Sequence, residues 1–154
     1  MLGAILLFFI FQGYVDCKLY LSNSSPLENR DYKMITRRIL IVDDEEGYRK
    51  VLSNSLSDLG YETKAVNNGF DALEEIRRKC YSIILLDVQM PGMDGIELLE
   101  QLQIARLSSN IVIITAYTDE EVVREAIRKG AKKVITKPFS TDDIEICLKE
   151  FTKH

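Results

Sequence analysis

Short apolar runs alternate with longer amphipathic segments from residue 38 to the end of the chain. The apolar runs are four or five residues long and rich in Ile and Val, which is typical of strands. They are Ile39–Val42, Thr63–Val66, Ile83–Leu86, Ile111–Ile114 and Lys133–Thr136. Three of them (ILIV, IILL and IVII) are continuous rather than alternating, as expected for parallel strands that are covered on both faces. The run TKAV is less apolar, which predicts an edge strand.

The amphipathic segments carry apolar residues at helical spacing, which predicts five helices. The residues that mark them are Val51, Leu52, Leu56 and Leu59; Phe70, Leu73 and Ile76; Ile96, Leu98, Leu99 and Leu102; Val122, Val123, Ala126 and Ile127; and Ile144, Ile146, Leu148 and Phe151. Asn67 or Asn68 is placed to cap the second of these helices, and Ser140 or Thr141 the last.

The regular alternation of strands and helices predicts the architecture. Five βα units between residues 34 and 154 indicate an α/β fold, a doubly wound (βα)5 arrangement around a parallel five-stranded sheet. Right-handed crossovers would place helices on both faces of the sheet. In open sheets of this kind, a functional site lies beyond the carboxyl ends of the strands.

Polar residues follow four of the predicted strands, so we expect them to meet at that edge. In chain order they are Asp43 and Asp44, Asp87, Thr115 and Ala116, and Lys137. Each one alone has an ordinary structural explanation, such as a helix cap, a turn or an exposed lysine. Together they bring carboxylates, a hydroxyl and an ammonium to one place, and close carboxylates need a proton or a cation between them. Oxygen ligands without Cys or His favour Mg²⁺.

The motifs at these positions resemble those of the receiver domain of two-component response regulators. They are DD (43–44), D…MPGMDG (87–95), TA (115–116) and KPF (137–139), in the order and spacing of that family. The resemblance covers residues 38 to about 151. It implies a flavodoxin-like sheet with strand order 2-1-3-4-5, an order that chemotaxis receivers also have.

The resemblance implies that Asp87 is the phosphoacceptor. The phosphoryl group would come from a phosphohistidine on a sensor histidine kinase or a histidine phosphotransfer protein. Mg²⁺ would be bound directly by Asp44 and through water by Asp43. Asp87 and the backbone carbonyl of Gln89 would complete the protein ligands.

The resemblance also assigns the contacts of the phosphoryl oxygens. Lys137 would pair with one oxygen, Thr115 would donate its hydroxyl to another, and the amide of Ala116 would assist. The Lys137–Pro138 peptide bond is expected to be cis. We do not expect an enzyme, but a protein that promotes only its own phosphoryl transfer and slow dephosphorylation.

Two positions bear on how such a receiver would signal. Many receivers carry an aromatic residue three positions before the lysine, where this chain has Val134. Without a ring that can rotate inward, we expect signalling through a backbone shift after Thr115 or through surface complementarity. Tyr117 would lie beside the phosphoryl site, where it either excludes water or is an ordinary surface tyrosine.

The expected downstream partner is a protein that contacts the surface of the fourth helix, fifth strand and fifth helix. That surface includes a basic group: Arg124, Arg128, Lys129, Lys132 and Lys133. About three residues follow the last helix, so we expect a stand-alone receiver. One alternative is a receiver fragment of a longer transcription regulator. Another is a Mg²⁺-dependent phosphatase, although no second acid stands two residues after Asp87, as such enzymes normally require.

The charge balance and the numbers of His and Cys residues exclude some kinds of partner and chemistry. The net charge is −4, from 20 basic and 24 acidic residues, which argues against direct binding of nucleic acid. The single histidine, His154, excludes chemistry that needs an internal histidine. The three cysteines (Cys17, Cys80 and Cys147) are odd in number and widely spaced, so we expect reduced thiols in the cytoplasm.

Residues 1–33 differ from the rest, and we expect them to lie outside the receiver domain, residues 34–154. They comprise an uncharged apolar run, MLGAILLFFIFQGYV, and a polar linker, and their three basic and three acidic residues cancel. A secretory signal is poorly supported because no basic segment precedes the run. A membrane tether through residues 1–15 is a second interpretation, although 15 residues of helix span only ~22 Å of a ~30 Å core. We favour a third, in which the natural start is Met34 and the preceding residues are an over-extended reading or a disordered tail.

Overall fold

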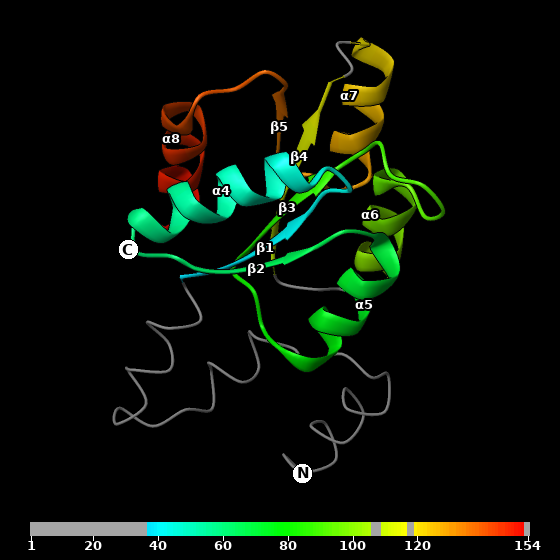
Figure 1. Cartoon of the computed structure of the whole chain (residues 1–154). Helices are drawn as coiled ribbons and strands as arrows, with labels where there is room; N and C mark the ends of the chain where they lie inside the picture. Colours follow the sequence, from blue (N-terminus) through cyan, green and yellow to red (C-terminus); the bar gives the residue numbers. More distant parts are fainter. Residues whose placement is uncertain (1–36, 106–108, 117–118, 153–154) are drawn as a thin grey trace, which may run out of the picture.

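The computed structural model describes residues 37–105, 109–116 and 119–152, and there it contains the five strands and five helices that the sequence predicts. In chain order the elements are β1 (Arg38–Val42), α4 (Glu46–Asp58), β2 (Glu62–Val66), α5 (Gly69–Arg78), β3 (Ile83–Asp87), α6 (Gly95–Ile104), β4 (Asn110–Thr115), α7 (Glu120–Arg128), β5 (Lys133–Thr136) and α8 (Thr141–Thr152) (Figure 1). The ends of the observed strands differ from the predicted ends by at most one residue.

The strands form one parallel sheet in the order β2-β1-β3-β4-β5. This is the order that the family resemblance implied, and it places the weakly apolar β2 at an edge, as predicted. The register pairs Val42 with Leu86, Asp87 with Ile114, and Thr115 with Thr136. The carboxyl ends of β1, β3, β4 and β5 are therefore level to within about one residue.

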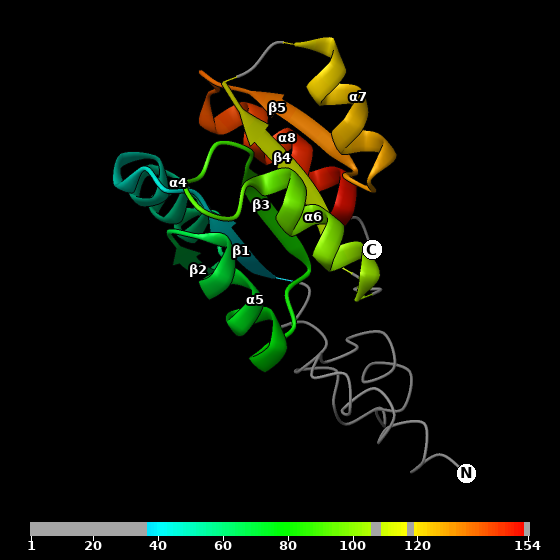
Figure 2. The ribbon, with the colours of Figure 1, turned by 90° about the vertical axis from the view of Figure 1, so that its right-hand side faces the viewer.

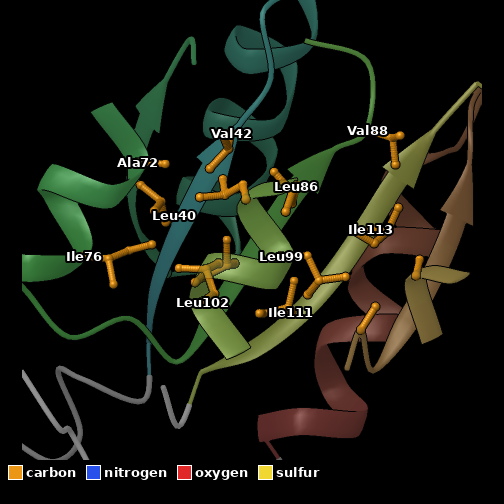
Figure 3. Packing of buried hydrophobic residues seen from close by; sticks show 14 of the residues in the cluster. Leu40, Val42, Ala72, Ile76, Leu86, Val88, Leu99, Leu102, Ile111 and Ile113 are labelled. Atoms are coloured by element: carbon orange, nitrogen blue, oxygen red, sulfur yellow. The ribbon is translucent and has the colours of Figure 1, made fainter. Parts of the chain in front are cut away.

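Helices cover both faces of the sheet, and each face has its own apolar cluster. One cluster joins β1, β3 and β4 to α5, α6 and α7, and the other joins the same strands to α4 and α8. Figure 2 shows α5, α6 and α7 in front of the sheet, with α4 and α8 behind it. In the first cluster, Leu40 and Val42 of β1 lie beside Ile76 of α5 and Leu99 of α6 (Figure 3). Burial on both faces explains why the central strands are continuous apolar runs.

The structure decides between the alternative helix caps. The side chain of Asn68, rather than Asn67, accepts a hydrogen bond from the backbone N–H of Asp71 at 2.8 Å. Helix α8 begins at Thr141, and Ser140 Oγ accepts the N–H of Asp143 at 3.2 Å. Ser140 is therefore the capping residue, which satisfies an N–H group that the first turn leaves without a helical partner.

Five of the residues that marked the predicted helices are exposed to solvent. Val51, Leu59, Phe70, Ile127 and Ile146 are 36–61% exposed. Val51, Ile127 and Ile146 each adjoin a buried helical residue, and one step along a helix turns the side chain by about 100°. Apolar character therefore located these helices correctly but did not identify their buried faces.

The cysteine prediction is wrong at one position. Cys80 is disulfide-bonded, whereas Cys147 is a free, buried cysteine. Pairing depends on the distance between cysteines in space, which their spacing along the chain does not determine. The thiol argument for a reducing compartment therefore no longer stands.

The interpretations of residues 1–33, of a start at Met34, and of Tyr117 fall outside the described residues. Among the helices of the described part, none has both the length and the apolar character needed to cross a bilayer.

A pair of glycine substitutions would test how tightly the loop after β3 packs. A Cβ atom on Gly95 would lie 2.2 Å from the carbonyl oxygen of Asp87 and 2.7 Å from Val88 Cα. We therefore expect Gly95→Ala to lower the free energy of unfolding by about 2–3 kcal/mol, because backbone must move to admit the methyl group. Denaturant unfolding measures this difference.

The matched control is Gly47→Ala in the first turn of α4, where nothing lies within 4 Å of the added Cβ. It should raise stability by up to about 1 kcal/mol, because alanine has the higher helix propensity. Equal stabilities of the two variants would contradict the close packing at Gly95.

Candidate functional site

The loops that follow β1, β3 and β5 bring together side chains that are far apart in the sequence. Asp43, Asp44 and Asp87 each place one carboxylate oxygen within 4.8 Å of the others. The ammonium of Lys137 lies 2.9 Å from Asp43 Oδ2 and 3.6 Å from Asp87 Oδ2. The acids and the lysine that the sequence placed at this edge of the sheet are therefore direct neighbours.

Burial divides these residues into two groups. Asp43, Asp87 and Thr115 are 2%, 3% and 0% exposed. Asp44 and Ala116 lie at the surface. The site thus consists of three buried polar side chains, with the exposed carboxylate of Asp44 next to them.

Hydrogen bonds from α4 hold the loop after β1. The backbone N–H of Glu45 donates to Asp43 Oδ1 at 2.8 Å. Arg49 Nη1 donates to the carbonyl oxygens of both Asp43 and Asp44, at 2.7 Å each. The guanidinium therefore fixes the backbone from which the two carboxylates project. Arg49 could not be predicted from the sequence, because no recognised motif marks an arginine one turn into this helix.

Lys137 is held by its backbone and by its side chain. Its N–H donates to the carbonyl of Thr115 at 2.7 Å, and the Lys137–Pro138 bond is cis, as expected. Its side chain is only 6% exposed. Burial alone would lower the pKa of Lys137, but the hydrogen bond to Asp43 and the charge of Asp87 outweigh it and raise the pKa. The ammonium is therefore charged at neutral pH.

Two further groups surround this ammonium. Glu45 Oε1 lies 3.6 Å from Lys137 Nζ, and the centroid of the Tyr48 ring lies 4.0 Å from it. Glu45 belongs to the acidic segment noted in the sequence. Tyr48 was missed, because a ring contact across two elements leaves no pattern in the spacing of residues.

The carboxyl of Asp87 has a raised pKa, because its surroundings disfavour the ionised form. Burial raises the pKa of its carboxyl to about 6, and the charges of Asp43 and Asp44 act in the same direction. Lys137 and the backbone N–H of Gln89 oppose the shift without cancelling it. Among the described residues, Asp87 Oδ1 is a buried oxygen with no hydrogen-bond partner. A carboxylate in this state attracts a cation or a proton.

The oxygen atoms of this site fit a hard divalent cation. Three carboxylates each offer an oxygen within 4.8 Å of the others, and one of them has an unpartnered buried oxygen. Among the described residues, no Cys or His belongs to this group. Such a donor set is suited to Mg²⁺, which prefers carboxylate oxygen and retains several waters.

The basic group expected on the downstream surface is largely paired with acids. The ion pairs there are Arg124 with Glu120, Lys129 with Glu100 and Glu125, and Lys133 with Glu150. The surface of α7 and β5 therefore presents alternating charge rather than one basic patch. Surface pairs of this kind contribute little to stability.

Comparison with known proteins shows which family this chain resembles. The family model for the response regulator receiver domain matches residues 39–149. Sporulation initiation phosphotransferase F of Bacillus subtilis is 35% identical over 118 residues, which are 77% of this chain and 95% of that protein. Regulatory protein AtoC of Escherichia coli is 37% identical over 111 residues, 72% of this chain but only 24% of that protein.

Solved structures show the same likeness. The chemotaxis protein CheY4 of Vibrio cholerae superposes with a TM-score of 0.71 and 28% identity, over 74% of this chain and 97% of that one. A CheY-like receiver domain protein of Methanospirillum hungatei superposes with a TM-score of 0.72 and 29% identity, over 75% and 93%. Because the receiver family model matches residues 39–149, well over half of the sequence, this chain belongs to the response regulator receiver family.

Proposed function

We propose that this receiver accepts a phosphoryl group on Asp87 and signals by protein contact. The donor would be a phosphohistidine of a sensor histidine kinase or a histidine phosphotransfer protein. The observation that carries the proposal is the state of Asp87, which is a 3%-exposed carboxylate with one unpartnered oxygen beside an ammonium and two further acids. Such a carboxylate favours binding of a cation, and the ammonium beside it can donate to the oxygens of a phosphoryl group.

Asp43, Asp44 and Asp87, with the backbone carbonyl of Gln89, would hold the Mg²⁺ ion. When bound, the ion supplies positive charge that offsets the negative charge of the transferring phosphoryl group. The raised pKa of Asp87 is consistent with this assignment, because burial in the first place, and the charges of Asp43 and Asp44 in the second, disfavour its ionised form until a cation binds.

The residues of the chain would act on the phosphoryl group in separate ways. An oxygen of ionised Asp87 forms the new bond to phosphorus as the bond from phosphorus to the donor histidine nitrogen breaks. Lys137 lies 3.6 Å from that carboxylate, within reach of a phosphoryl oxygen attached to it. Thr115 and the amide of Ala116 would contact the remaining oxygens. The chain would thus promote its own phosphorylation and slow dephosphorylation, without acting as an enzyme on other substrates.

Two modes of output remain, and each has a relative that favours it. The phosphotransferase of Bacillus subtilis matches over 95% of its length, which favours a small relay protein. Regulatory protein AtoC matches over 24% of its length, which favours the receiver part of a longer regulator. We propose the relay role, with downstream contact through α7, β5 and α8. A histidine kinase donor would place the protein in the cytoplasm, and contact with nucleic acid is not part of the proposal.

Asp87→Ala should abolish phosphorylation, because it removes the only carboxylate proposed to form the bond. Wild-type protein incubated with Mg²⁺ and a phosphorylated histidine phosphotransfer protein should gain one phosphoryl group by intact mass. The variant should gain none, and chelation of Mg²⁺ should suppress the gain in wild type.

Asp58→Asn, at the exposed end of α4, is the matched control and should be phosphorylated like wild type. Phosphoryl uptake by the Asp87→Ala variant at the wild-type rate would rule out Asp87 as the acceptor.

Asp87→Asn should stabilise the metal-free protein at neutral pH. Burial is the main cause that raises the pKa of Asp87 from 3.8 to about 6, so the folded state holds this proton more tightly than the unfolded state. Stability is therefore lost as the pH rises from about 4 to about 6, where the carboxyl ionises. A shift of about two pKa units corresponds to roughly 2–3 kcal/mol at pH 7.5, which the asparagine avoids.

Denaturant unfolding in the presence of a chelator measures this difference at pH 7.5 and again at pH 4, where it should nearly vanish. Added Mg²⁺ should stabilise the wild type and leave the asparagine variant little changed. A variant no more stable than wild type at pH 7.5 would show that the charge of Asp87 is already compensated.

A further inference from the structure

The ammonium of Lys137 lies over an aromatic ring as well as beside carboxylates. Its Nζ is 4.0 Å from the centroid of the Tyr48 ring, which comes from the first turn of α4. At this distance the negative face of the ring attracts a cation. Tyr48 is part of none of the motifs that mark the site.

Besides its hydrogen bond to Asp43 at 2.9 Å, the Lys137 ammonium has two more distant carboxylate neighbours. Asp87 Oδ2 and Glu45 Oε1 are equally far from Nζ, at 3.6 Å. The side chain of Asp87 is 3% exposed, whereas that of Glu45 is 61% exposed. Lysine has a flexible stem and a strongly hydrated head, so the exposed Glu45 would draw it out toward water. The observed side chain is nevertheless only 6% exposed.

The Tyr48 ring packs against a second aromatic ring, that of Phe139. Its centroid lies 5.9 Å from that of Phe139, with the two planes inclined by 38°. Phe139 stands two residues after Lys137 and packs against the apolar cluster under α4 and α8. A tilted aromatic pair at this distance is attractive, so the ring is held from α4 on one side and from the chain after β5 on the other.

We propose that Tyr48 is a positioning residue for Lys137. Its ring face holds the ammonium in its buried position beside Asp43 and Asp87, where a phosphoryl oxygen would arrive. The proposal deepens the proposed function, on which it rests for its consequence, but the placement of Lys137 is measurable without any phosphoryl group.

The first measurement uses the metal-free protein and the NMR signals of the Lys137 side chain. A ring face near Nζ shifts the Hε protons of Lys137 upfield. We expect this shift in wild type and in Tyr48→Phe, which keeps the ring, and its loss in Tyr48→Leu. Phe70→Leu is the matched control, because it removes a 61%-exposed ring elsewhere and should leave the shift unchanged. Unfolding midpoints confirm that each variant folds.

The second measurement is the affinity for beryllofluoride, a phosphoryl mimic, in the presence of Mg²⁺. Tyr48→Leu should bind it about 3- to 10-fold more weakly than wild type, whereas Tyr48→Phe and Phe70→Leu should bind it like wild type. Rescue by phenylalanine separates the effect of the ring face from a general loss of packing or of the hydroxyl.

The outcomes separate the two hypotheses. A wild-type Lys137 without the upfield shift, or a Tyr48→Leu variant with wild-type affinity, would overturn the role of Tyr48. If wild type itself failed to bind beryllofluoride, the proposed function would fail, and the NMR shift alone would decide whether Tyr48 holds Lys137.

Discussion

One ammonium faces two buried carboxylates at the end of the sheet, and the chemistry of the site depends on that imbalance. Removing charges from water costs several kcal/mol each, and a single cation does not compensate two anions. Lys137 bonds to Asp43 at 2.9 Å and stands farther from Asp87, at 3.6 Å. Asp87 is therefore the less compensated member of the pair. Burial is the main cause that raises the pKa of Asp87, and the more distant ammonium does not cancel it, which makes this carboxylate suited to gain a cation.

The parallel sheet brings site residues that are far apart in the sequence close together in space. Because the strands run in one direction and their register is level, the residues that follow β1, β3 and β5 emerge side by side. Local contacts then set the finer geometry. Arg49 ties down the carbonyls of Asp43 and Asp44, and Gly95 lets α6 start against the carbonyl of Asp87. Both devices act on backbone, which keeps the carboxylate side chains available for a ligand.

The strands, the α/β class and the edge that bears the site could be predicted from the sequence, because burial on both faces forces continuous Ile and Val runs. Strand order could not, since it depends on pairing between segments far apart, and it came only from the family resemblance. The exposed faces of the helices were missed for a related reason: Val51 and Leu52 are both apolar, but only Leu52 is buried. The roles of Arg49 and Tyr48 could not be predicted either, because contacts between elements leave no periodic pattern in the sequence.

The same contacts restrict how a phosphoryl group could be sensed. The N–H of Lys137 is bonded to the carbonyl of Thr115, so the two residues expected to contact the phosphoryl group are joined through the backbones of β4 and β5. Val134, in the same strand as Thr136, is a partly buried residue that packs against the cluster under α7. A valine has no ring to rotate between two positions. We therefore still expect that a change at Lys137 would be passed on as a shift of these paired backbones, toward the surface that α7 and β5 share.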